Sequence, residues 1–169
     1  MTSTTVQDLR SKSDAAWANL TRQLQGMEPY MEQSDAPGRW STREVLSHLL
    51  LMPSWEPVAF LTQFSERDLP LVELEPGQSH LTAERRTMTL QEFVNALDLQ
   101  RRSVLAYIEG LSDAELQQRK VRIPVFKQFI GTDEISLAMF TGAMFDFHWH
   151  GHASQLAKIR NAIGLPEAK

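Results

Sequence analysis

Three of the five histidines in the chain lie within one short stretch. The stretch reads FDFHWHGHASQL from Phe145 to Leu156 and places imidazoles at His148, His150 and His152. Histidines inside an otherwise apolar segment are typical of catalysis, metal binding or pH sensing, since lysine or glutamate would serve solubility better. We therefore expect the chemistry of the protein to involve this stretch.

Helical geometry separates the three histidines. Each residue of an α-helix advances by about 100°, so His148 and His152 share one stripe while His150 points away from both. Two imidazoles at this spacing can bind one divalent cation, as the paired histidines of zinc-protease helices do. Two ligands are too few for a metal site, so a third must come from another element.

His48 is the best candidate for the third ligand. It lies among Val45, Leu49 and Met52 in a second predicted helix, so its ring is expected to face the interior, where a histidine is costly unless paired. Three histidines from two facing helices leave coordination positions open, which is typical of a catalytic site. Imidazole ligands suit zinc, nickel, copper or iron, and we expect zinc or nickel.

Simpler interpretations exist for each of these histidines. The His-x-x-x-His spacing occurs by chance on many helices, and an interior histidine such as His48 is more often hydrogen-bonded to a carbonyl than bound to a metal. His150 is expected at the surface or at a subunit contact. His80 is expected in a loop, with the entrance of the site as the alternative. Asp146 is interpreted as a surface or interface residue, and Glu44 as a helix cap, with support of His48 as its alternative role.

Four amphipathic stretches are predicted to form the helices that position these residues. They run from about Val6 to Met27, from Ser41 onward, from Thr89 to Gly110, and from a cap at Thr132 to about Ala162. Three capping boxes are predicted, at Ser41 with Glu44, Thr89 with Glu92, and Ser112 with Glu115. Trp40 is interpreted as a hydrophobic staple before the second helix. The pattern predicts an all-α, four-helix bundle.

Prolines are predicted to interrupt the second helix. Pro53 cannot donate to the carbonyl of Leu49 and Pro57 repeats the defect, so we expect a kink or short break before helix resumes toward Gln63. Residues 65–88 then form a long polar connection, of a kind that often covers a site. No convincing strand pattern is present, and the stretch VRIPVFKQFIG is expected to be extended or irregular.

Composition narrows the class of protein. At 169 residues we expect one domain over residues 1–169, and a net charge of −4 argues against nucleic-acid binding. The chain has no cysteine, which excludes disulfides, iron–sulfur clusters and a cysteine nucleophile. Neither a secretory signal nor an apolar run of about 18 residues is visible, so a cytoplasmic location without membrane association is expected.

The last predicted helix is apolar nearly all round between Leu137 and Trp149. A helix in a bundle needs only one apolar stripe. The excess predicts a second buried face, and we expect a homodimer packed through this helix.

The motifs together resemble those of the DinB/YfiT-like family of four-helix-bundle proteins. GRWSTREVLSHLL resembles the family's Trp-Ser…His-Leu signature, HWHGHASQLAKIR resembles its His-x-x-x-His-x-x-Gln motif, and LAYIEGLSDAEL resembles the end of its third helix. In this order they span nearly the whole chain. The chain departs from the family in having Ala-Ser-Gln where Arg-Gly-Gln is common, so any role of that arginine is absent.

The resemblance implies an up-down-down-up bundle with His48, His148 and His152 as metal ligands and Gln155 near the site rather than on the metal. Family members include metal-dependent hydrolases and thiol-dependent transferases or isomerases, and many are dimeric. An ion held by three neutral ligands can lower the pKa of a bound water, or it can hold the thiolate of a low-molecular-weight thiol cofactor. Either chemistry would act on a small-molecule substrate, and the sequence identifies no catalytic acid or base.

Two alternatives remain open at the level of sequence. One is a non-catalytic protein that binds a small molecule or acts in a stress response, with the metal structural or absent. The other is a helical protein whose histidines only pack in the core, in which case their replacement by alanine would cost stability without any metal dependence.

Overall fold

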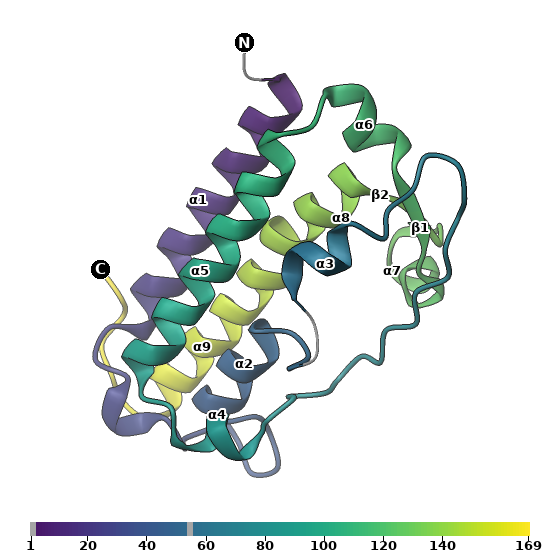
Figure 1. Cartoon of the computed structure of the whole chain (residues 1–169). Coiled ribbons are helices and arrows are strands. Elements are labelled where there is room, and N and C mark those ends of the chain that lie inside the picture. The colour runs from purple at the N-terminus through teal and green to yellow at the C-terminus, as the bar shows by residue number, and fades with distance from the viewer. Residues whose placement is uncertain (1–2, 54–55) are drawn as a thin grey trace.

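The computed structural model describes residues 3–53 and 56–169, and four long helical stretches dominate it (Figure 1). These are α1 (Thr4–Leu24), α2 followed by α3 (Thr42–Leu49 and Pro57–Leu61), α5 (Leu90–Glu109), and α8 to α9 (Leu137–Ala143 and His150–Ala162). In Figure 1, α1 and α8–α9 run in one direction while α2–α3 and α5 run in the other. The predicted up-down-down-up four-helix bundle is confirmed. In the described part of the chain, no helix has the length and apolarity needed to cross a membrane.

The predicted capping boxes fix where helices begin. Ser41 accepts from the backbone N–H of Glu44, whose carboxylate in turn accepts from the Ser41 N–H at 2.8 Å. The same exchange begins α5, between Thr89 and Glu92, and the short α6 (Asp113–Gln118), between Ser112 and Glu115. Each box satisfies amides that the first helical turn leaves unpaired. Glu44 therefore has the capping role expected of it.

The second helix breaks where the prolines predicted it would. Helix α2 ends at Leu49, before Pro53, and α3 begins with Pro57 in its first turn, where a missing N–H costs nothing. Ser54 and Trp55 lie outside the described residues. Leu51, just after α2, has a left-handed backbone with φ +63°. The break leaves His48 in the last turn of α2.

The predicted start of the last helix is wrong. Instead of capping it, Thr132 accepts from the N–H of Glu134, and residues Glu134–Ser136 form strand β2. This strand pairs antiparallel with β1 (Lys120–Arg122), placing Val121 opposite Ile135. Ser136 then caps α8 by accepting from the N–H of Met139. Three-residue strands are too short to show a recognisable alternation, which is why the hairpin escaped the sequence pattern.

Two short helices fill the hairpin between the strands, η2 (Pro124–Phe126) and α7 (Lys127–Ile130). The stretch expected to be extended or irregular is thus strand and helix in part. Another short turn, η1 (Glu28–Tyr30), follows α1.

The last helix changes its winding part-way. Residues Met144–Trp149 form a π-helical segment, η3, between α8 and α9. A π turn holds more residues than an α turn, and such segments occur frequently at functional sites. His148 lies within it, while His152 lies in the first turn of α9.

The long connection is held at both ends. Ser65 pairs with Lys120 and Leu71 with Arg122, which attaches its first part to β1. Its last part forms α4 (Ala83–Thr87) beside α2. Between these anchors, the chain passes back along the bundle from the hairpin end to the α4 end (Figure 1).

Candidate metal centre

His48, His148 and His152 come together between α2 and the last helix. One ring nitrogen from each can be chosen so that all three lie within 4.8 Å of one another. The Nε2 atoms of His48 and His148 are 2.7 Å apart, and the ring centroids of each pair are separated by 4.8 Å. The three histidines that the sequence predicted to be neighbours are therefore close together, although His48 and His148 are 100 residues apart in the chain.

Hydrogen bonds on the far side of two rings decide which nitrogens face the cluster. The Nδ1 of His48 lies 2.6 Å from the backbone carbonyl oxygen of Gln78. A carbonyl only accepts, so Nδ1–H donates to it and the Nε2 of the neutral ring keeps a free lone pair. The Nδ1 of His152 makes the equivalent contact with Oε1 of Gln155, at 2.9 Å. Gln155 therefore lies beside the cluster and orients a ring, as partners of metal-bound histidines do.

Burial favours the neutral form of the three clustered histidines. It lowers the pKa of His148 to about 3 and that of His48 to about 4, and the neighbouring histidines add to both shifts. The pKa of His152 is also lowered by burial. All three rings are therefore neutral at pH 7, the form in which imidazole binds a metal ion.

Two further aromatic rings flank His48. The Trp40 ring lies 4.8 Å from that of His48 and is stacked on His152 at 6.1 Å, with 17° between the planes. His80 stacks on His48 at 6.2 Å and 7°. His80 lies in the connection between α3 and α4, so the expected loop placement is confirmed, and its ring also lies beside the site. From the sequence, Trp40 was interpreted only as a hydrophobic staple. Its position two residues before the helix that carries His48 was the one feature that could have indicated a place beside the site.

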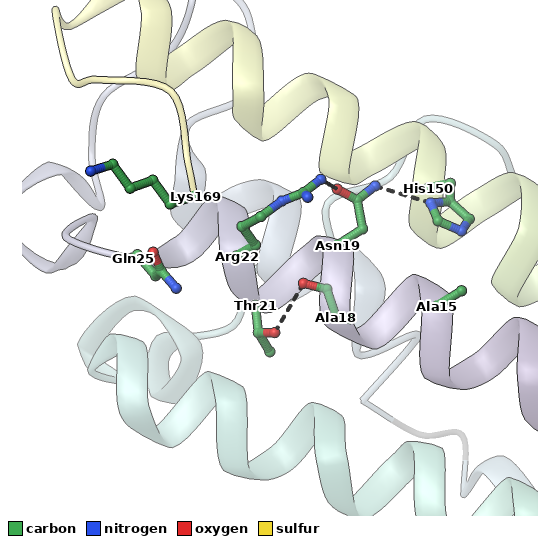
Figure 2. Close-up of a pocket in the computed structure, with 8 residues that line it drawn as sticks. All are labelled: Ala15, Ala18, Asn19, Thr21, Arg22, Gln25, His150 and Lys169. Atoms are coloured by element: carbon green, nitrogen blue, oxygen red, sulfur yellow. Dashed lines mark hydrogen bonds between the residues drawn. The ribbon is translucent and has the colours of Figure 1, made fainter.

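The other candidate side chains lie elsewhere. The Nδ1 of His150 is 3.0 Å from Nδ2 of Asn19 on α1, as Figure 2 shows. His150 therefore faces α1 and not the cluster, as predicted. Asp146 forms an ion pair with Lys12 of α1 at 3.5 Å. A shallow hollow of about 640 Å³ lies next to His150, between α1, α9 and the C-terminal segment, and Figure 2 shows its lining. None of the three clustered histidines lines it.

The donor set fits a divalent cation. Three neutral imidazoles whose nitrogens converge on one point, with two rings fixed from behind, are the ligand type that zinc and nickel accept. The described residues bring no carboxylate into the group. A bound ion would therefore keep its full positive charge.

Comparison with known proteins places the chain in a family. The family model of the DinB superfamily matches residues 4–140. The chain belongs to the DinB superfamily. The matched part includes His48 but ends before His148 and His152, so for these two residues the geometry described above carries the argument.

A solved structure has the same fold. YfiT from Bacillus subtilis, described as "a probable metal-dependent hydrolase with an unusual four-helix bundle topology", superposes with a TM-score of 0.70. The sequences are 16% identical, and the match covers 95% of this chain and 89% of YfiT. No curated protein sequence matches the chain.

Proposed function

We propose that this DinB-superfamily protein is a metal-dependent hydrolase in which His48, His148 and His152 hold one divalent cation. The observation that carries the proposal is the convergence of three ring nitrogens within 4.8 Å, each from a ring kept neutral by burial. The likeness to YfiT, a protein described as a hydrolase of this kind, supports the reaction class. Zinc or nickel is the expected ion.

A cation at this position would supply Lewis acidity for a substrate carbonyl or phosphoryl oxygen and would lower the pKa of a water molecule. The residues of the chain have separate tasks around it. The carbonyl of Gln78 and the side chain of Gln155 hold His48 and His152 in the tautomer that presents Nε2. The rings of Trp40 and His80 flank that of His48 and form aromatic walls of the cluster.

Thiol-dependent transfer at the same ion is a second candidate. The chain has no cysteine, so a thiol that reacts here must be a low-molecular-weight cofactor supplied from outside. An ion with three neutral ligands and its charge intact would favour the thiolate form of that cofactor. The two candidates share the metal and differ in the nucleophile.

One comparison tests both candidates. Untagged protein is prepared as wild type, His148→Ala and His150→Ala, and each is loaded with zinc or nickel. Hydrolysis of a panel of activated esters and amides is then measured, as is consumption of small thiols with an electrophile. We expect turnover in the wild type and in His150→Ala, and none in His148→Ala.

Metal bound in full without turnover in either assay would support the non-catalytic alternative, a protein that binds a small molecule or acts in a stress response. Absence of metal from every preparation would leave only packing roles for the three histidines.

A further inference from the structure

Two residues other than glycine have left-handed backbone conformations in the described part of the chain. They are Leu51, with φ +63°, and His80, with φ +54°. L-amino acids with a β-carbon rarely adopt this conformation because it is strained, and it persists only where the surroundings enforce it. Leu51 follows α2 at a position where helices commonly have glycine.

A single guanidinium nitrogen contacts both strained residues. The Nη1 of Arg85, in α4, donates to the carbonyl oxygen of Leu51 at 2.8 Å and to that of His80 at 3.3 Å. It also donates to the carbonyl oxygen of Ser47 at 2.8 Å, in the last turn of α2, and lies 3.3 Å from the Ser47 hydroxyl. Because Nη1 has only two hydrogens, they are shared among these acceptors, and the longer contact with His80 is the weaker one. Arg85 therefore joins the end of α2 to the connecting segment.

His48 belongs to the end of α2, and its ring contacts the other segment that Arg85 joins. On the α2 side, the carbonyl of His48 accepts from the N–H of Leu51. On the other side, the Gln78 carbonyl accepts from His48 Nδ1, and the ring of His80 stacks on that of His48. The helix end and the segment that touches the ring are thus held by the same side chain.

We propose that Arg85 is a positioning residue of the metal centre, which fixes His48 by tying the end of α2 to residues 78–80. This inference rests on the proposed function. A helix-capping role alone would explain the bonds to Ser47 and Leu51. It would not explain the bond to His80 or the strained backbone there.

Loss of the guanidinium releases both strained residues. Residues 78–80 then move away from α2, and the Gln78 carbonyl no longer accepts from His48. The ring becomes free to carry its proton on Nε2, where no lone pair would face His148. Outer partners of metal-bound histidines typically change metal affinity by about 10- to 100-fold, and we expect Arg85→Gln to weaken Zn²⁺ binding by that factor.

Two measurements on Arg85→Gln and wild type test the proposal. Zn²⁺ affinity is measured by competition with a chromophoric chelator, and the tautomer of His48 is read from ¹⁵N NMR of the metal-free protein. The matched control is Arg160→Gln. Arg160 donates to the backbone carbonyls of Gln23, Gln25 and Pro166, away from the cluster, so its loss should lower the melting temperature while Zn²⁺ affinity and the His48 tautomer stay unchanged.

A second variant separates positioning from stability. Glycine adopts the left-handed conformation without strain, so Leu51→Gly should restore stability to Arg85→Gln and provides a folded protein if the single variant unfolds. The segment around His80 stays untethered in Arg85→Gln/Leu51→Gly, so we expect Zn²⁺ affinity to stay low and the His48 Nδ1–H tautomer to be lost.

The proposal would be overturned if Arg85→Gln had the Zn²⁺ affinity and the His48 tautomer of wild type. It would also be overturned if adding Leu51→Gly to Arg85→Gln restored both in full. If wild type itself binds no Zn²⁺, the proposed function fails. The tautomer of His48 in the metal-free proteins still decides whether Arg85 positions the ring.

Discussion

The Nε2 atoms of His48 and His148 lie 2.7 Å apart, although the two residues are separated by 100 positions in the chain. Because His48 donates through Nδ1 to the Gln78 carbonyl, its Nε2 presents a lone pair to its neighbour. A contact this short between two neutral rings needs either a proton carried by His148 or a shared cation. The two cases differ in whether Nε2 of His148 carries a proton.

Replacement of one clustered histidine should empty the metal centre. We expect purified wild type to carry about one divalent ion per chain and His148→Ala to show at least a tenfold lower content, since even outer-sphere changes cost about 10- to 100-fold in affinity. Elemental mass spectrometry of untagged protein measures this. His150→Ala is the matched control, because it removes an imidazole two residues away that faces Asn19. Equal metal content in the two variants would contradict the three-histidine assignment.

Removal of metal should lower the melting temperature. An ion that binds only the folded protein stabilises it by about 2.7 kcal/mol when its free concentration is a hundredfold above Kd. We expect wild type to melt at a lower temperature after chelator treatment, and at its original temperature once zinc is restored. His148→Ala should melt at the same temperature with and without chelator. Identical melting of the wild type in both conditions would argue against a tightly bound ion.

Stability of the metal-free protein should fall in mild acid. The pKa of His148 is lowered by burial to about 3 and that of His48 to about 4, against an ordinary value of 6.5. Between pH 6.5 and about 4 the unfolded chain binds protons at these positions and the folded chain does not. The free energy of unfolding therefore decreases as pH falls through this window, and the contribution is fully present above pH 6.5.

Urea unfolding of chelated protein at a series of pH values measures that slope. His148→Gln removes one of the buried titrating groups and should show a shallower decrease than wild type. The control His150→Gln leaves the cluster intact and should retain the wild-type slope. A wild-type slope in His148→Gln would show that His148 is not held neutral by the fold.

We propose that the protein is a homodimer packed through α8 and η3. The structure leaves Phe147 76% exposed and Met139 43% exposed on this helix, although Phe145 and Trp149 beside them are buried. Light scattering should give the mass of two chains for wild type, and Phe147→Glu should shift it to that of one. Leu99→Glu, at a residue 61% exposed on α5, is the control and should remain dimeric. A wild-type mass of one chain would refute the proposal.

Much of the fold could be predicted because local signals agree with it. Ser41 with Glu44 and Thr89 with Glu92 begin helices by a mechanism confined to four residues, and Pro53 ends one by lacking an N–H. The hairpin and the late start of α8 depend instead on pairing between residues such as Val121 and Ile135. Pairing between residues far apart in the chain produces no recognisable sequence pattern in strands of three residues.

Some parts of the candidate site could likewise be predicted from local sequence, and others could not. His148 with His152 follows from helical spacing, and His48 from its apolar neighbours. The Gln78 carbonyl could not be predicted, because a backbone acceptor has no sequence signature. The stacking of His80 and the bonds of Arg85 depend on the path of a long connection that carries no periodic pattern.

The π-helical segment η3 has a consequence for how this helix can change over evolutionary time. A helix with one extra residue in a turn is out of phase with a regular α-helix by about 100° beyond that turn. Deletion of one residue between Met144 and Phe147 would let the helix return to regular winding. The change would act as a rotation of α8 relative to α9 rather than as a shortening, turning residues such as Phe140 and Thr141 out of the core while His152 kept its place. A substitution in η3 alters the contacts of one side chain. An insertion or deletion in η3 instead rotates all of α8 relative to α9 and so changes every contact that α8 makes.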